Sequence, residues 1–88
     1  MRIKEGFVLK QVANKWIVVP VEENAIHFNG LLTLNDSGYK LFEQLQEGDV
    51  TVEMLVKTLT DLYEVDRTTA KQDVLSFIQK LKEKDLIE

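Results

Sequence analysis

The pattern of apolar and polar residues is typical of strands in the first third of the chain and of helices in the rest. The stretches GFVLKQV and KWIVVPV are rich in β-branched and aromatic residues, which favour strands. Between them, Ala13 and Asn14 predict a two-residue turn, because Asn tolerates a positive φ. The pattern leaves open which face of this hairpin is core, although the face with Lys10 and Lys15 is expected to be the wetter one.

A second turn signal, Asn29 followed by Gly30, separates the apolar runs at residues 25–28 and 31–34. Two arrangements fit this pattern. The two runs pair as a hairpin across a type I′ turn, or they form one longer strand with a bulge at Gly30. In both arrangements residues 31–34 are extended and end the β portion of the chain.

The remaining residues follow a helical period. Asn35 is a good N-cap directly after the strand, with Leu34 and Tyr39 spaced for a hydrophobic staple. Gly48 is expected to end this first helix in the left-handed conformation. The strand should therefore pass into the helix with no intervening loop.

Two further helices are predicted, one from about Thr51 and one from the capping residue Asp66 to about Lys84. Three strands followed by three helices make an α+β fold, in one domain with a β portion at 1–34 and a helical portion at 35–88. The residues expected to face the core from the first two helices are Leu41, Phe42, Leu45, Val52, Leu55, Val56, Leu59 and Leu62.

The last predicted helix carries more apolar surface than one buried face needs. At about 100° per residue its core residues span about 60°, and Leu75 and Ile78 widen the apolar arc to about 160°. One interpretation is that Leu75 is a half-exposed surface leucine, which is common. The core residues within the narrower arc are Ala70, Val74, Phe77 and Leu81.

The other interpretation is a binding groove. Leu75 and Ile78, with Lys71 and Lys82 beside them, would form one wall for an apolar, partly acidic peptide. The strand at residues 31–34 would form the opposite wall, and its unpaired edge could accept another strand. The same open edge also invites self-pairing, so a weak homodimer is an expected side effect.

Composition and charge narrow the function. A chain of 88 residues buries roughly 60 to 65% of its unfolded surface as one domain, which leaves little room for a deep substrate cavity and disfavours a small-molecule enzyme. The net charge of −4 disfavours a nucleic-acid partner. No apolar run is long enough for a signal peptide or for the roughly 20 residues of a membrane span, so we expect a cytoplasmic protein with no membrane partner.

Candidate chemistry is sparse. His27 is the single histidine, and the chain has no cysteine, so a structural role for His27 is favoured over a metal site. The serines and threonines have no second histidine to activate them, and the glycines are too dispersed for a phosphate loop. We therefore expect no catalytic residue, no cofactor and no metal.

Over nearly its whole length the chain resembles the PqqD family of peptide-binding domains, also called RiPP precursor recognition elements. The resemblance rests on the order and spacing of VVP at 18–20, FNGLLTLNDSG at 28–38, LFEQLQEG at 41–48, TVEMLVKTLTDLYEVD at 51–66 and DVLSFIQKLKEKDLIE at 73–88. It implies a winged helix-turn-helix-like fold of three antiparallel strands and three helices.

The resemblance also implies a role. Such a domain binds the leader of a ribosomally made precursor peptide as a strand added to the third strand, and presents the peptide to a modifying enzyme, often a radical SAM maturase. Synthesis of the cofactor pyrroloquinoline quinone (PQQ) is one pathway served in this way. The implied contact positions are Leu31, Leu32, Thr33, Leu34, Lys71, Leu75, Ile78 and Lys82.

Two functional classes remain, a peptide-binding adaptor and a winged-helix nucleic-acid-binding or transcriptional module. The second needs a helix with Arg and Lys gathered on one exposed face. The helix from Thr51 offers Lys57 against Glu53, Asp61 and Glu64, so the adaptor is favoured.

Overall fold

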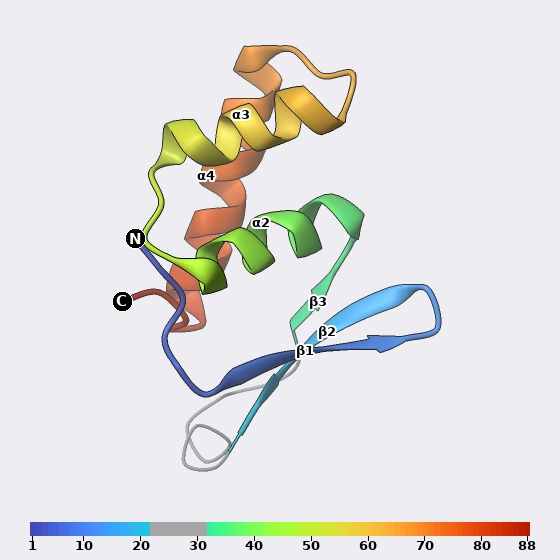
Figure 1. The fold of residues 1–88 in the computed structure, drawn as a ribbon, viewed down its shortest axis with the longest axis vertical. Coiled ribbons are helices and arrows are strands. Elements are labelled where there is room, and N and C mark those ends of the chain that lie inside the picture. Colours follow the sequence, from blue (N-terminus) through green and yellow to red (C-terminus); the bar gives the residue numbers. More distant parts are fainter. Residues whose placement is uncertain (22–31) are drawn as a thin grey trace.

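The computed structural model describes residues 1–21 and 32–88, and within them a three-stranded sheet precedes three helices (Figure 1). The α+β class and the order of elements are confirmed. The arrangement predicted for residues 25–30, and His27, lie outside the described residues. The elements are β1 (Phe7–Val12), β2 (Lys15–Pro20), β3 (Leu32–Leu34), α2 (Asp36–Glu47), α3 (Val52–Leu62) and α4 (Arg67–Glu83).

The sheet is antiparallel, with strand order β1-β2-β3. One of its faces carries Phe7 and Val18, both buried in the core. The opposite face carries Val8 and Val12, which are 40% and 55% exposed. The face with the lysines is therefore the wetter one, as predicted, and the helices cover the other.

The turn between β1 and β2 has the predicted length, but its backbone differs from the expectation. The positive φ belongs to Ala13, at 56°, and not to Asn14. A positive φ at only the first central residue is the pattern of a type II′ turn, whose twist also suits a hairpin.

The predicted N-caps Asn35 and Asp66 are confirmed, and Thr51, near which the second helix was expected to begin, is an N-cap as well. In each, a side-chain oxygen accepts a hydrogen bond from the backbone N–H three residues later, which satisfies one of the free donors at the helix start. The pairs are Asn35 with Gly38 (2.8 Å), Thr51 with Met54 (3.2 Å) and Asp66 with Thr69 (2.7 Å).

The joint between β3 and α2 is as direct as the sequence indicated, since only Asn35 separates them. Tyr39 in the first turns of α2 stacks on Trp16 of β2, with ring centroids 3.9 Å apart and planes 4° from parallel. Trp16 is in turn the cross-strand partner of Leu34. The start of α2 is thus fixed to the sheet by a cap and an aromatic pair.

The Asn35 cap gives a stability prediction. Replacing Asn35 with alanine is expected to lower the free energy of unfolding by about 1 kcal/mol, because the N–H of Gly38 loses its acceptor. In a domain of this size that is a fall of about 4 to 8 °C in melting temperature, measurable by circular dichroism. Asn35→Asp keeps an acceptor and serves as the control; equal losses in the two variants would contradict the assignment of this cap.

Two details of the helix ends differ from the sequence prediction. Gly48 has φ 173°, an extended conformation rather than the left-handed one that was expected. Leu62, expected to face the core, is 54% exposed at the end of α3. Both residues lie where a helical period stops, so the pattern of the preceding turns no longer fixes their direction.

The end of α4 is a Schellman motif. Asp85 has a positive φ of 59°, its N–H donates to the carbonyl of Lys82, and the N–H of Leu86 donates to the carbonyl of Leu81. This reversal turns Leu86 back into the core, where it is fully buried.

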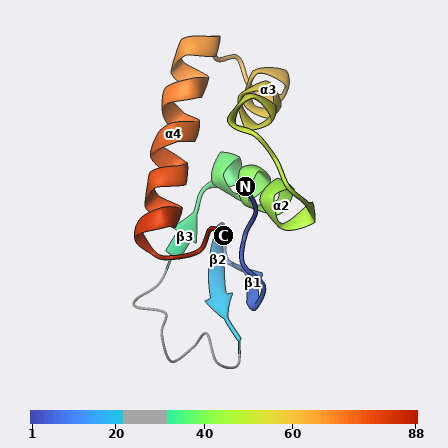
Figure 2. The same cartoon turned by 90° about the vertical axis from the view of Figure 1, so that its left-hand side faces the viewer.

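The core lies between the inner face of the sheet and the three helices (Figure 2). Each helix contributes the apolar positions that its period predicted, apart from Leu62. The largest fully buried side chains are Phe42, Leu41, Leu45, Leu55, Leu81, Leu86, Val18, Val56 and Val74.

Candidate functional site

Among the strands that the structure describes, β3 is an edge strand, and its open side faces α4. Along its other side it pairs with β2, in the register Trp16 with Leu34, Ile17 with Thr33 and Val18 with Leu32. Among the described strands none pairs with the free side, and the C-terminal half of α4 runs past it (Figure 2). Edge N–H and C=O groups of this kind can hydrogen-bond an added extended chain.

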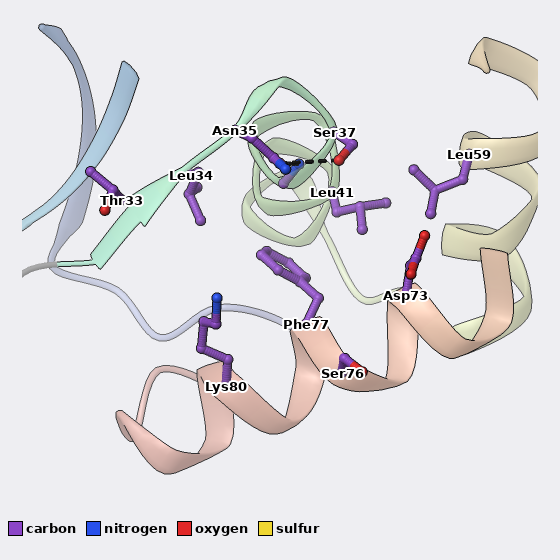
Figure 3. Close-up of a pocket in the computed structure, with 11 residues that line it drawn as sticks. Thr33, Leu34, Asn35, Ser37, Leu41, Leu59, Asp73, Ser76, Phe77 and Lys80 are labelled. Carbon is purple, nitrogen blue, oxygen red and sulfur yellow. Dashed lines mark hydrogen bonds between the residues drawn. The ribbon is translucent and has the colours of Figure 1, made fainter. Parts of the chain in front are cut away.

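A groove of about 500 Å³ lies between β3, the start of α2, and α4 (Figure 3). Thr33 and Leu34 line it from the strand, and Asn35 and Ser37 line it at the start of α2. The residues contributed by α4 are Asp73, Ser76, Phe77 and Lys80.

The middle of the groove is apolar. Phe77 is partly buried and projects from α4 toward the side of the groove formed by Leu34 and Leu41 (Figure 3). Leu34 and Leu41 are only 5% and 2% exposed, so they form a buried apolar wall opposite Phe77. Such a surface favours an apolar side chain from an occupant, since covering it removes more apolar area from water.

The groove continues into a smaller cavity of about 310 Å³ beyond Asn35. Its lining adds Asp36, Tyr63 and Val65 to residues that the two cavities share, among them Asp73. The Tyr63 hydroxyl donates a hydrogen bond to Asp36 at 2.9 Å. Burial, and then this bond, raise the pKa of Tyr63. This end of the groove therefore combines apolar walls with two carboxylates.

The structure places the predicted strand residues as follows. Leu32 and Leu34 are buried, at 3% and 5% exposure, so an occupant of the edge meets mainly their backbone. Thr33 is exposed and lines the groove. Leu31 lies outside the described residues.

The predicted helix residues lie elsewhere than the groove. Ile78 is only 5% exposed and belongs to the core, so little of its side chain is open to a peptide. Leu75 is 47% exposed but lines a separate depression on α4, and the exposed Lys71 and Lys82 do not line the groove either. Contact of these four residues with a peptide stays a prediction.

Phe77 lines the groove, although its place in the narrower apolar arc predicted a core residue. Phe77 lies at one edge of that arc. The helical period alone does not show which edge of the arc lies beside β3. The structure places the Phe77 flank there, together with Asp73 and Lys80.

In the described ranges, 1–21 and 32–88, no three acidic or histidine residues are grouped so as to hold a metal ion. The helices of those ranges are too short or too polar to cross a membrane.

Comparison with known proteins gives a family match and two similar structures. The family model described as coenzyme PQQ synthesis protein D (PqqD) matches residues 15–87. A structure of TbiB1 in complex with the TbiA(beta) leader peptide is 24% identical, with a TM-score of 0.78 over 100% of this chain and 95% of that one. Lasso peptide synthetase B1 complexed with the leader peptide is 22% identical, with a TM-score of 0.73 over 97% and 93%. The comparison with curated proteins gave no match.

Proposed function

Since the chain belongs to the PqqD family, we propose that it is a non-catalytic adaptor that binds the leader of a ribosomally made precursor peptide. The observation that carries this proposal is the edge of β3 that no described strand covers, beside an apolar groove with Phe77 at its centre. The two solved structures of the same fold, TbiB1 and lasso peptide synthetase B1, are both complexes with a leader peptide.

Strand addition needs an open strand edge rather than a catalytic group. Backbone hydrogen bonds to β3 give affinity for any extended peptide, and alternate side chains that enter the groove give selectivity. The edge and the groove lie on the same side of β3, so one extended peptide can use both.

The proposal extends to a second partner, a modifying enzyme that acts on the presented peptide. A radical SAM maturase is the enzyme class that the family resemblance implies, and PQQ synthesis is one pathway of that kind. The lasso peptide synthetase among the similar structures supports the broader class, modification of a ribosomally made peptide.

A nucleic-acid-binding role has less support from the charges. On α3, the Lys57 ammonium lies 3.0 Å from Asp61, four residues later on the same helix. Arg67 at the start of α4 is paired with Glu53. These cations already have acidic partners, so neither offers a free charge to a phosphate.

The binding test uses synthetic leader peptides encoded by precursor genes next to the gene for this chain. Trp16 is the only tryptophan and is the cross-strand neighbour of Leu34, so its fluorescence should respond when β3 gains a partner. We expect saturable binding of one leader, and an increase of about 2.7 kcal/mol in the free energy of unfolding at a leader concentration of 100 Kd. Binding of duplex DNA, with no response to any of the leaders, would contradict the adaptor and support a nucleic-acid-binding module.

A further inference from the structure

Opposite charges lie at the two ends of the groove (Figure 3). The Lys80 side chain rises from α4 toward β3, beside Leu34. The Asp73 carboxylate lies two turns earlier on the helix and points toward Leu59 on α3. Among the described residues that line this groove, these two carry its only formal charges.

Neither charge is neutralised within the part of the chain that the structure describes. Lys4 and Lys57 have acidic partners at 2.8 and 3.0 Å, whereas no ion pair or side-chain hydrogen bond joins Lys80 or Asp73 to any described residue. An occupant of the groove thus meets one free cation and one free anion.

Helix termini modify these charges without reversing them. The start of α2 contributes about half a positive charge near the Asp73 end. Asp36 and Asp73 both line the smaller cavity at that end and together carry two negative charges, so the net sign there is negative. Lys80 lies in the last turn of α4, where the helix end contributes only about half a negative charge.

We propose that the groove selects its peptide by charge order. This inference rests on the proposed function. The preferred occupant is an extended segment with an acidic side chain beside Lys80, an apolar side chain over Phe77, and a basic side chain beside Asp73. Charge complementarity of this kind fixes orientation and register more than it adds raw affinity.

The spacing of the three positions fits an extended chain. Asp73 and Lys80 are seven residues apart, which is about 10.5 Å along a helix. Side chains on one face of a strand recur about every 6.7 Å, so positions i and i+4 are about 13.4 Å apart. The flexible ends of Lys and Glu side chains cover the remaining 3 Å or so, and position i+2 falls over Phe77.

The direction of the peptide follows from the sheet. All its pairs are antiparallel, and antiparallel pairing is the more stable kind per residue. β3 runs from Thr33 toward Asn35 and hence from the Lys80 end to the Asp73 end (Figure 3). An antiparallel peptide therefore places its basic residue first and its acidic residue last.

The test uses three peptides with identical flanks and blocked ends, with the central sequences KTLTE, ETLTK and QTLTQ. For the unmodified protein we expect KTLTE to bind about five- to tenfold more tightly than ETLTK at low salt, with QTLTQ between them, as two exposed ion pairs allow. The preference should shrink as salt rises. In the double variant Asp73→Lys with Lys80→Asp, the order of KTLTE and ETLTK should reverse.

The outcomes separate this inference from the proposed function. Equal affinity for KTLTE and ETLTK, or an order that the double variant leaves unchanged, overturns the charge rule and leaves the adaptor intact. If none of the three peptides binds while a natural leader does, the charge rule is likewise overturned and the adaptor left intact. If the natural leaders do not bind either, both the charge rule and the adaptor function are overturned. Because both substitutions are at exposed positions, thermal unfolding should confirm that the double variant folds.

Discussion

Replacing Phe77 with alanine is expected to weaken leader binding by up to about fivefold. The ring is the largest apolar group in the middle of the groove, and it is only partly buried before a peptide covers it. Full burial of an exposed phenylalanine side chain contributes about 1.5 to 3 kcal/mol, so covering the remaining third or less contributes up to about 1 kcal/mol, or about fivefold in affinity. Isothermal titration calorimetry with the best natural leader measures the effect.

Leu75→Ala is the matched control, because Leu75 lies on the same helix, is 47% exposed and lines a different depression. Its affinity should stay within about twofold of the unmodified protein. Phe77→Leu keeps an apolar side chain and should recover part of the loss, and thermal unfolding checks that each variant is folded. A loss in Leu75→Ala with none in Phe77→Ala would restore the wall predicted from the apolar arc.

Methylation of every second backbone nitrogen in the leader is expected to weaken binding strongly when the methylated nitrogens face β3. Methylation of the other nitrogens, which point away from β3, should leave the affinity nearly unchanged. In an extended chain, successive N–H groups point to opposite sides, so only every second one can reach the edge of β3. Each lost hydrogen bond costs about 1 kcal/mol, and the added methyl also clashes with the strand, so we expect at least a tenfold loss. The protein itself is unchanged, so its fold is not at risk.

The comparison needs two peptides of the same sequence, methylated at the odd or at the even positions over the segment that meets β3. Competition against a fluorescent leader gives both affinities in one assay. Equal losses, or no loss in either peptide, would mean that the leader does not bind as an added strand.

Much of the fold could be predicted because local chemistry decides it. Asn35, Thr51 and Asp66 each combine a capping side chain with a following helical period, and each begins a helix in the structure. The turn length between β1 and β2 was also predictable, because two strand-like runs are separated by two residues. At these positions the local signal and the tertiary packing agree.

The site was only half predictable, for a physical reason. The free edge of β3 follows from the strand order, and Thr33 does line the groove. The flank of α4 that faces this edge depends on how the helix docks on the sheet, which a helical period does not encode. Leu75 and Phe77 lie on opposite flanks of the apolar arc, about 160° apart, and it is the Phe77 flank that lines the groove.

The sequence also failed to predict side-chain exposure and backbone conformation at the helix ends. Leu62 fits the inward period of α3 but is exposed, because it occupies the last position of the helix, where the chain turns toward α4. Gly48 adopts an extended backbone that any residue can take, so its identity as glycine carried no structural signal there.

We expect a leader peptide to add to β3 and to lie against the Phe77 flank of α4. Amide NMR of the labelled protein during titration with a natural leader tests it most directly. If the leader adds to β3, shift changes should concentrate in Leu32–Leu34 and at residues 73–80, with cross-strand contacts between the peptide and β3. Shifts confined to the β1–β2 hairpin or to α3, with β3 unchanged, would contradict it.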